Sequence, residues 1–142
     1  MIPYPDASQA PISVIKKDHT LPLYACGDGI QKWFYILGSM VYYKQSIICI
    51  DEIDTGFHHE AQAQFSINLV KSAIKNGVQL FMTTHNIEFI DSFLSSVMDK
   101  TEINSDMIKI ITLRNTSEGL KARTIQADEA YKGRNSYNLE LR

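Results

Sequence analysis

Cysteines, blocks of one charge and long apolar runs are all scarce in this 142-residue sequence. Two cysteines are too few for a disulfide scaffold, and Cys49 falls in an apolar run where a small buried thiol is expected, so a reducing cytoplasm fits best. Net charge is −2 without a Lys/Arg block, so bulk charge assigns neither a nucleic-acid nor a membrane surface. No apolar stretch approaches the roughly 18 residues of a membrane helix, and the start, MIPYPDASQAP, is too polar for a signal peptide.

The composition that is present is that of one ordinary folded domain. Hydrophobic residues make up 44% of the chain and charged residues 21%, a balance typical of a globular protein and unlike a disordered one. A chain of 142 residues is long enough to bury a core. We therefore expect a single domain over residues 1–142.

Short strands and helical periods alternate in the first half of the chain. ISVIKK, residues 12–17, predicts a strand, and DHTLPLYACGDG, residues 18–29, predicts a loop. A helix is predicted over residues 30–44, immediately after Gly27-Asp28-Gly29. Its apolar residues recur at i, i+3, i+4, i+7 and i+11, which predicts one inward face. These residues are Ile30, Trp33, Phe34, Leu37 and Val41.

The middle of the chain predicts a strand, a helix and a second strand joined by short links. SIICI, residues 46–50, is continuously apolar, which indicates a strand covered on both faces. A helix is expected from about His59 to Asn76, ended by Gly77, and VQLFMTT, residues 78–84, follows as a strand. Such a unit predicts parallel strands with a right-handed crossover. The inward stripe of the helix is Phe65, Leu69, Ala73 and Ile74.

The last third predicts one more helix and a hairpin. Asn86 is a suitable N-cap for a helix reaching about Asp99. MIKIITLRN and LKARTIQA flank a glycine-bearing turn and predict a terminal β-hairpin, whereas the polar residues 128–142 stay unassigned. Three prolines in the first dozen residues predict an irregular start. The inward positions of the helix are Ile87, Ile90, Leu94 and Val97.

Two adjacent acids end the first of the central strands. In open parallel sheets, ligands bind beyond the carboxyl ends of the strands, and this rule puts Asp51 and Glu52 beside Thr83, Thr84 and His85. Mg²⁺ prefers oxygen ligands and is often held by one carboxylate plus substrate phosphates. The neighbouring Glu can accept a proton from the attacking water, so the pair has the form of a Walker B segment. A solvated acidic loop is the simpler alternative.

Two further features point to the same chemistry. His85 follows the second strand, where a group that senses a γ-phosphate would stand, although a lone His is usually a surface residue. The Gly27-Asp28-Gly29 segment opens a helix, and a helix N-terminus offers N–H groups and a positive dipole to an anion. A simple tight turn is the alternative interpretation of that segment.

Three segments together resemble a known family. LPLYACGDGIQKWFYIL, SIICIDEIDTGFHHEAQ and VQLFMTTHNIEFID look like the signature, Walker B with D-loop, and H-loop segments of ABC-like AAA ATPases. The group most resembled is that of bacterial ATP-binding proteins related to the overcoming-lysogenisation-defect (OLD) and SMC families. The resemblance covers roughly residues 20–92 and implies an α/β fold: a partial P-loop NTPase-like, ABC-type sheet with flanking helices and a C-terminal β-hairpin.

The resemblance also implies roles for particular residues. Asp51 would bind Mg²⁺, Glu52 would be the catalytic carboxylate and His85 would be the γ-phosphate switch. Gly27, Asp28 and Gly29 would form the signature loop. In this family the signature loop of one subunit closes over ATP held by another, so a head-to-tail homodimer around ATP is implied.

The sequence departs from the family pattern in three ways. No G-x-x-x-x-G-K-[ST] occurs in these residues, so a P-loop-bearing N-terminal segment or partner chain would have to supply the phosphate cradle. The chain therefore resembles the C-terminal lobe of the ATPase fold and is not expected to hydrolyse ATP alone. These residues show no Toprim-like nuclease region, so nuclease activity is not assigned from this chain. Where members usually have a proline after the D-loop His, the chain reads FHHEAQ, so neither His58 nor His59 is assigned a catalytic role.

Two alternatives stay open beside the ATPase interpretation. The first is a non-hydrolysing interaction module that pairs with a P-loop-containing ATPase. The second is a metal hydrolase using His58, His59, Asp51 and His85, which is disfavoured because adjacent histidines on a helix point about 100° apart. The aromatic residues around the first helix favour core and interface packing over base stacking. An incomplete sheet would expose strand edges and an apolar face, which predicts self-association or modest solubility.

Overall fold

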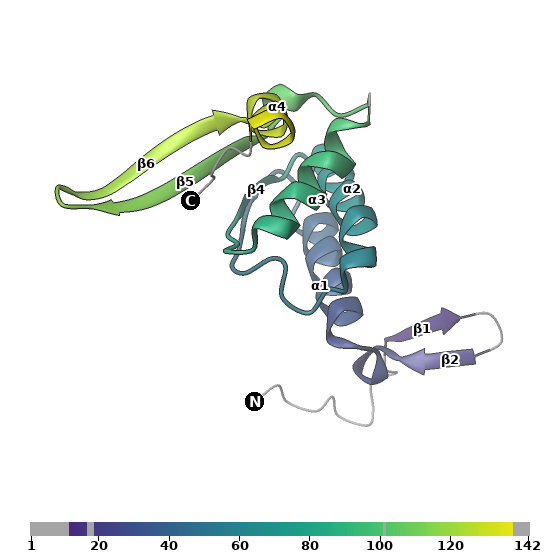
Figure 1. Ribbon diagram of the computed structural model, residues 1–142. Coiled ribbons are helices and arrows are strands. Elements are labelled where there is room, and N and C mark those ends of the chain that lie inside the picture. The colour runs from purple at the N-terminus through teal and green to yellow at the C-terminus, as the bar shows by residue number, and fades with distance from the viewer. Residues whose placement is uncertain (1–11, 17–18, 101, 138–142) are drawn as a thin grey trace.

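The computed structural model of the protein describes residues 12–16, 19–100 and 102–137 (Figure 1). The irregular start expected from the prolines falls on residues 1–11 and lies outside the described part. In chain order the elements are β1 (Ser13–Lys16), β2 (His19–Pro22), the 3-10 helix η1 (Leu23–Ala25), α1 (Asp28–Tyr42), β3 (Ile47–Ile50), α2 (His59–Asn76), β4 (Gln79–Met82), α3 (Ile87–Met98), the 3-10 helix η2 (Ser105–Met107), β5 (Lys109–Thr116), β6 (Gly119–Gln126) and α4 (Ala127–Tyr137).

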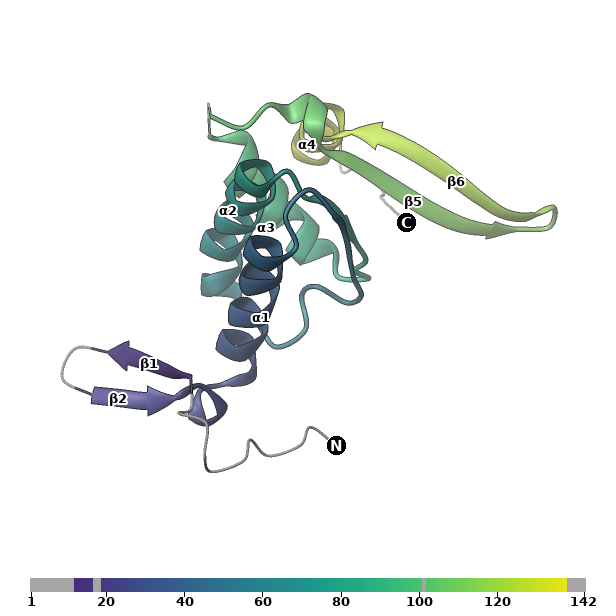
Figure 2. The same cartoon turned by 180° about the vertical axis from the view of Figure 1, so that it is seen from behind.

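Strands β3 and β4 form a parallel pair, as the sequence predicts. Their register runs from Ile47 opposite Gln79 to Ile50 opposite Met82, and α2 is the helix that connects them. Helices α1, α2 and α3 lie together on one side of the pair in both views (Figures 1 and 2). The polar residues that follow the two strands therefore leave the sheet at the same edge.

The prediction that these strands are covered on both faces is wrong for the described residues. Alternate residues of β3 and β4, such as Ile48 and Leu80, pack against the core, while the intervening residues face outward. Ile47 is 65% exposed, Phe81 is 48% exposed, and Cys49 is exposed instead of buried. An open apolar face of this kind means that the part of the chain described here does not supply a second covering layer.

The core lies between the helices and the covered face of β3 and β4. Met40 of α1, Phe65 and Leu69 of α2 and Leu94 of α3 are almost completely buried. Ile53, which follows the acid pair, is 1% exposed and therefore fixes that turn to the core. The most extensive helix contact is that between α2 and α3, and the α1–α2 and α3–α4 contacts follow it equally.

Helix α1 differs from its predicted orientation. Trp33 and Leu37 do pack against the core, and the Trp33 ring meets Phe65 edge-on at 5.6 Å between centroids. The other three predicted inward residues, Ile30, Phe34 and Val41, are at least 41% exposed. The helix is apolar over more than one face, so periodicity alone did not identify the side that the core occupies. Tyr35, Tyr42 and Tyr43 are exposed too.

Helices α2 and α3 closely match their predicted boundaries. Gly77 ends α2 with φ of 66°, a left-handed conformation that glycine adopts without steric cost. Asn86 caps α3, its side chain accepting hydrogen bonds from the N–H groups of Glu88 and Phe89. The predicted inward stripe of α2 holds except at Ile74, which is 42% exposed. In α3 Leu94 and Val97 are buried, Ile87 and Ile90 are partly buried against the core, and Phe89 and Phe93 add to it.

The outer elements agree with the predictions in part. The C-terminal hairpin is present as antiparallel β5 and β6, and β1 occupies the predicted first strand. The predicted loop after β1 is wrong at residues 19–22, which form β2 because they pair antiparallel with β1. The unassigned polar tail contains α4, which buries Ala127 and Ala130 and is joined to α3 by an Arg134–Asp91 ion pair of 2.5 Å. None of the helices described combines the length and apolar character needed to cross a membrane.

Candidate functional site

The acid pair and the threonine of the neighbouring strand meet at one edge of the sheet. Beyond the last strand residues, the N–H of Thr83 donates to the carbonyl of Ile50 at 2.9 Å, and the N–H of Ile53 donates to the carbonyl of Thr83 at 3.0 Å. These bonds continue the parallel pairing past Ile50 and Met82. The sequence-based expectation that Asp51 and Glu52 lie beside Thr83 is thereby confirmed.

Asp51 presents an exposed carboxylate at the end of β3. One of its oxygens, Oδ1, accepts a hydrogen bond from the hydroxyl of Thr83. This contact fixes the direction of the side chain while Asp51 keeps its access to solvent. A fixed, solvent-facing carboxylate oxygen suits Mg²⁺, which binds through one or two carboxylates and retains several waters.

The alternative of a histidine-rich metal centre finds no such geometry. Among the described residues, no group of three or more His, Cys, Asp or Glu side chains is placed to hold one metal ion. His58 and His59 are exposed at the start of α2, apart from any such cluster.

Glu52 occupies a left-handed backbone conformation with φ of 47°. Residues other than glycine seldom adopt this region, and they keep it where surrounding contacts impose it. The N–H of Glu52 donates to the Thr83 hydroxyl at 3.0 Å, and its carbonyl accepts from Lys32 Nζ at 2.7 Å. The backbone of Glu52 is thus held on both sides, while 58% of its side chain is exposed.

His85 stands opposite the Glu52 carboxylate. Its Nδ1 lies 3.8 Å from Glu52 Oε1, and the two side chains are 80% and 58% exposed. This separation is too long for a direct hydrogen bond, and it matches two groups that face a shared water or oxygen. The structure therefore brings together Asp51, Glu52 and His85, three of the residues named from the sequence.

Asp54 and Thr84 extend the polar edge and were missed by sequence reasoning as a pair. The Thr84 hydroxyl donates to Asp54 Oδ1 at 2.6 Å and accepts from the N–H of Asn86 at 3.0 Å. Burial acts to raise the pKa of Asp54, but hydrogen bonds from Thr84, its own backbone and Asn86, with the charge of His85, lower it below the ordinary value. Asp54 lies in SIICIDEIDTGFHHEAQ, two residues after Glu52, and this position is the sequence signal that could have identified it.

The Gly27-Asp28-Gly29 segment forms the start of α1, as predicted. Gly27 is the N-cap and Asp28 is the acidic residue of the first turn. Gly29 lies so close to the loop after Glu52 that a Cβ atom built on it would be 2.5 Å from the carbonyl oxygen of Gly56. Asp28 and Gly29 therefore lie against Gly56, whereas a Cβ built on Gly27 would meet nothing within 4 Å.

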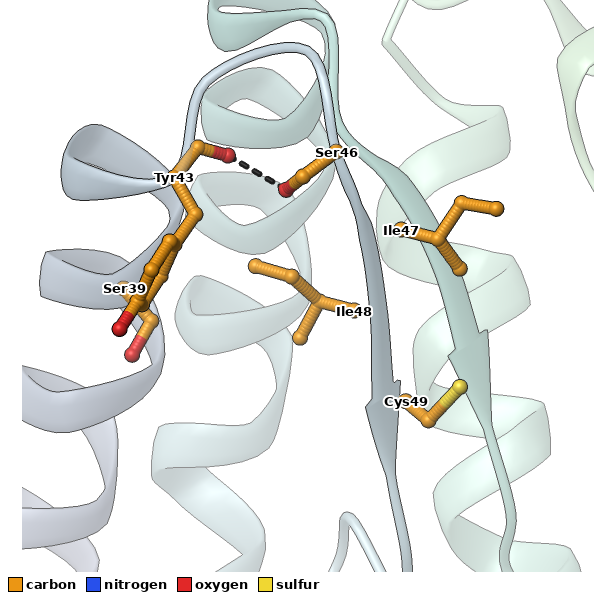
Figure 3. Close-up of a pocket in the computed structure, with 6 residues that line it drawn as sticks. All are labelled: Ser39, Tyr43, Ser46, Ile47, Ile48 and Cys49. Carbon is orange, nitrogen blue, oxygen red and sulfur yellow. Dashed lines mark hydrogen bonds between the residues drawn. The ribbon is translucent and has the colours of Figure 1, made fainter.

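A surface hollow lies at the opposite end of β3. A depression of about 390 Å³ is lined by Ser39, Tyr43, Ser46, Ile47, Ile48 and Cys49 (Figure 3). The Ser46 hydroxyl donates to the Tyr43 carbonyl at 2.5 Å along one side of it. Since this hollow lies at the start of the strand and the acids follow its end, it takes no part in the polar site.

Comparison with known proteins places this geometry in a family. The model of the family described as "AAA domain, putative AbiEii toxin, Type IV TA system" matches residues 9–91, more than half of the chain. An ATP/GTP phosphatase of Helicobacter pylori is 27% identical over 123 residues, which are 84% of this chain and 33% of that protein. The chain thus spans about a third of the length of that relative.

Two further similarities differ in extent. Uncharacterized protein MJECL11 of Methanocaldococcus jannaschii is 26% identical over 117 residues, covering 82% of this chain and 98% of that protein. A solved structure described as "Structural biochemistry of ATP-driven dimerization and DNA stimulated activation of SMC ATPases" aligns with a TM-score of 0.53 at 12% identity. It covers 87% of this chain and 69% of that chain, and it shows a shared P-loop NTPase-like fold. The chain therefore belongs to this AAA-domain family and corresponds to the C-terminal part of an ABC-like ATPase fold.

Proposed function

We propose that this chain supplies the hydrolytic half of an ATP-hydrolysing site, in which Glu52 activates the attacking water and His85 contacts the γ-phosphate. The observation that carries the proposal is the 3.8 Å approach of His85 Nδ1 to Glu52 Oε1 at the edge of two parallel strands. A carboxylate can accept a proton from a water molecule, and an imidazole N–H can donate to a phosphate oxygen. The two groups are close enough to act on the same oxygen-rich substrate.

Asp51 would hold the magnesium ion of the substrate. Its carboxylate is exposed and oriented by Thr83, as a ligand to a partly hydrated cation requires. A bound Mg²⁺ would neutralise charge on the β- and γ-phosphates. The Thr83 hydroxyl donates to the Asp51 carboxylate and accepts a hydrogen bond from the main-chain N–H of Glu52. One residue therefore aligns both acids.

The phosphate cradle would come from another segment or another chain. The 142 residues contain no G-x-x-x-x-G-K-[ST], which is the loop that wraps nucleotide phosphates in this class of ATPase. The exposed face of β3 and β4, which carries Ile47 and Phe81, is a surface that such a lobe would cover. Gly27, Asp28 and Gly29 lie at a helix N-terminus apart from Glu52, which suits a signature loop acting on ATP of a second subunit in a head-to-tail dimer.

Reconstitution tests this function. The chain, combined with a P-loop-bearing segment, is expected to release phosphate from MgATP, and Glu52→Gln should lower kcat by about 10²- to 10⁴-fold because the base is lost. Glu60→Gln is the matched control, since Glu60 is an exposed carboxylate in the first turn of α2. Hydrolysis that is equally fast with Glu52→Gln and with Glu60→Gln would show that Glu52 is not the base.

One comparison favours a second candidate function. The archaeal relative is matched over 98% of its own length, so a protein of about this extent occurs among the relatives. A chain of this kind would act as a non-hydrolysing module that binds a P-loop-containing ATPase and completes or blocks its site. Size-exclusion chromatography with such an ATPase checks this candidate: formation of a mixed complex whose hydrolysis is unaffected by Glu52→Gln would favour it over the first.

A further inference from the structure

We propose that Lys32 is a positioning residue that fastens the turn bearing Glu52 to helix α1, so that the catalytic carboxylate and the signature loop move as one unit. The inference rests on the proposed ATPase function of the site. Lys32 lies in the second turn of α1, five residues after Gly27. Nothing in its sequence context marks it, because a single lysine on a helix is usually a surface residue.

The contacts of Lys32 are with main-chain oxygens of the catalytic turn. Its Nζ donates to the carbonyl of Glu52 at 2.7 Å and to the carbonyl of Thr55 at 3.2 Å. These carbonyls lie at the two ends of one turn, which is itself closed by a hydrogen bond from the Thr55 N–H to the Glu52 carbonyl at 3.2 Å. Hydrogen bonds from an ammonium group are stronger than those from neutral donors, so Lys32 is well suited to hold the turn.

The turn needs external support because Glu52 is left-handed. Three main-chain groups at this point are tied down: the N–H of Glu52 and the N–H of Ile53 bond to Thr83, and the Glu52 carbonyl bonds to Lys32. The first two ties come from the end of β4. Only the third comes from α1. Loss of the Lys32 ammonium would therefore remove the tie from the Glu52 carbonyl to α1, while the Thr55 hydrogen bond within the turn and the two bonds to Thr83 remain.

A second contact joins the same helix to the same segment. Gly29 packs against the carbonyl of Gly56, with no room for a side chain between them. The start of α1 thus contacts the Glu52–Gly56 segment at both of its ends, through Lys32 and through Gly29. A shift of the signature loop on engaging nucleotide would be passed directly to the backbone of the catalytic glutamate.

A role of Lys32 as a simple ion-pair partner does not fit its geometry. Lys32 forms no ion pair within 4.0 Å with the described residues, and its bonds go to carbonyls instead of carboxylates. The side chain is half-buried, with Nζ 6.0 Å from the centroid of the Phe57 ring. Burial lowers the pKa of Lys32, although the charges of Asp54 and Glu52 oppose the change. Hydrogen bonds from Lys32 to two main-chain carbonyls are what is required to hold the turn in position.

The test uses this chain together with the P-loop-bearing segment. Lys32→Met should lower kcat for MgATP by about 10- to 100-fold, as expected when a catalytic group is misplaced by about 1 Å. KM should stay within about twofold, because Lys32 bonds to the turn and has no proposed contact with the substrate. Lys75→Met is the matched control, since Lys75 is exposed on α2. Lys32→Arg, which keeps a charged donor, should restore part of the lost kcat.

A double variant separates positioning from a general structural effect. If Lys32 acts through Glu52, then adding Lys32→Met to Glu52→Gln should produce little further loss of kcat. Circular dichroism of each variant identifies misfolding, and Lys32→Gln replaces Lys32→Met if the latter does not fold. A raised KM with unchanged kcat, or multiplicative losses in the double variant, would overturn the inference. If Glu52→Gln alone had no effect, the proposed function would fail first, whatever Lys32 does.

Discussion

The main-chain N–H of Glu52 donates to the hydroxyl of Thr83 at 3.0 Å, across the end of two parallel strands. The same hydroxyl donates to the Asp51 carboxylate. One threonine hydroxyl therefore holds Asp51, the proposed magnesium ligand, by its side chain and Glu52, the proposed base, by its main-chain N–H. This relationship makes Thr83 as important to the proposed chemistry as Asp51, Glu52 and His85.

Replacement of Thr83 by Val should weaken catalysis more than it weakens folding. Thr83→Val keeps the shape but removes the hydroxyl, which costs about 1 kcal/mol of unfolding free energy for the lost hydrogen bonds. In the complete ATPase, kcat should fall by about tenfold or more, because both acids lose alignment. Thr83→Ser is the control and should retain most activity. Equal kcat for Val and Ser variants would contradict the assignment.

The left-handed backbone of Glu52 predicts a conflict between stability and activity. Glycine adopts φ near 47° without steric cost, whereas alanine does not. Glu52→Gly should therefore be more stable than Glu52→Ala by about 1 kcal/mol, and both should be inactive. Urea unfolding followed by circular dichroism measures the difference. Equal stability of the two variants would show that the turn relaxes to another conformation.

The close approach of Gly29 to Gly56 predicts a difference between neighbouring glycines. A Cβ on Gly29 would lie 2.5 Å from the Gly56 carbonyl oxygen, while a Cβ on Gly27 would meet nothing within 4 Å. Gly29→Ala should cost about 1–3 kcal/mol because backbone must move. Gly27→Ala should cost less, about 0.5–1 kcal/mol, because the added Cβ meets nothing and only the poorer N-cap preference of alanine counts. Thermal unfolding of the two variants makes the comparison.

Asp54 predicts a pH dependence of folding. Its pKa is lower in the folded chain than its ordinary value of about 3.9, so its contribution to stability is present above that value and is lost as pH falls through the lower, folded pKa. As pH falls below about 4, the free energy of unfolding of Asp54→Asn should therefore decrease less than that of the wild type. Urea unfolding at a series of pH values checks this. Parallel curves for the two proteins would exclude the linkage.

The open face of β3 and β4 predicts self-association of the chain in the absence of its covering partner. Phe81→Thr removes an exposed apolar ring, so it should reduce light scattering and raise solubility. Leu120→Thr is a control on β6, away from this sheet, where the exposed side chain has similar apolar character. An unchanged scattering signal in Phe81→Thr would place the associating surface elsewhere.

Sequence reasoning succeeded where the signal was local or followed from chain order. The caps at Asn86 and Gly77 and the parallel order of the two strands follow from residue type and alternation of elements. It failed where the answer depends on what covers a surface. The run around Cys49 is equally compatible with one covered face or two, and Ile74 belongs to an apolar stripe wider than the core.

The contacts that support the site could not be predicted from the sequence for a related reason. Lys32 is separated from Glu52 by twenty residues, and only the packing of α1 against the acidic turn brings its ammonium to the carbonyls. Asp54 and Thr84 are thirty residues apart and meet because the two strands end together. Tertiary contacts of this kind leave no spacing pattern in a single sequence.

The register of β3 and β4 has a consequence for how mutations act at a distance. Ile48 and Leu80 face the core, and this buried set fixes which residues stand opposite one another. A slip of one residue would shift β4 by about 3.3 Å against β3 and turn its side chains to the other face of the sheet, so the segment that carries His85 would no longer follow β4 beside Glu52. Ile48 and Leu80, which lie apart from Asp51, Glu52 and His85, therefore set the alignment of the proposed site, and substitutions at these two positions could abolish activity with all three proposed site residues unchanged.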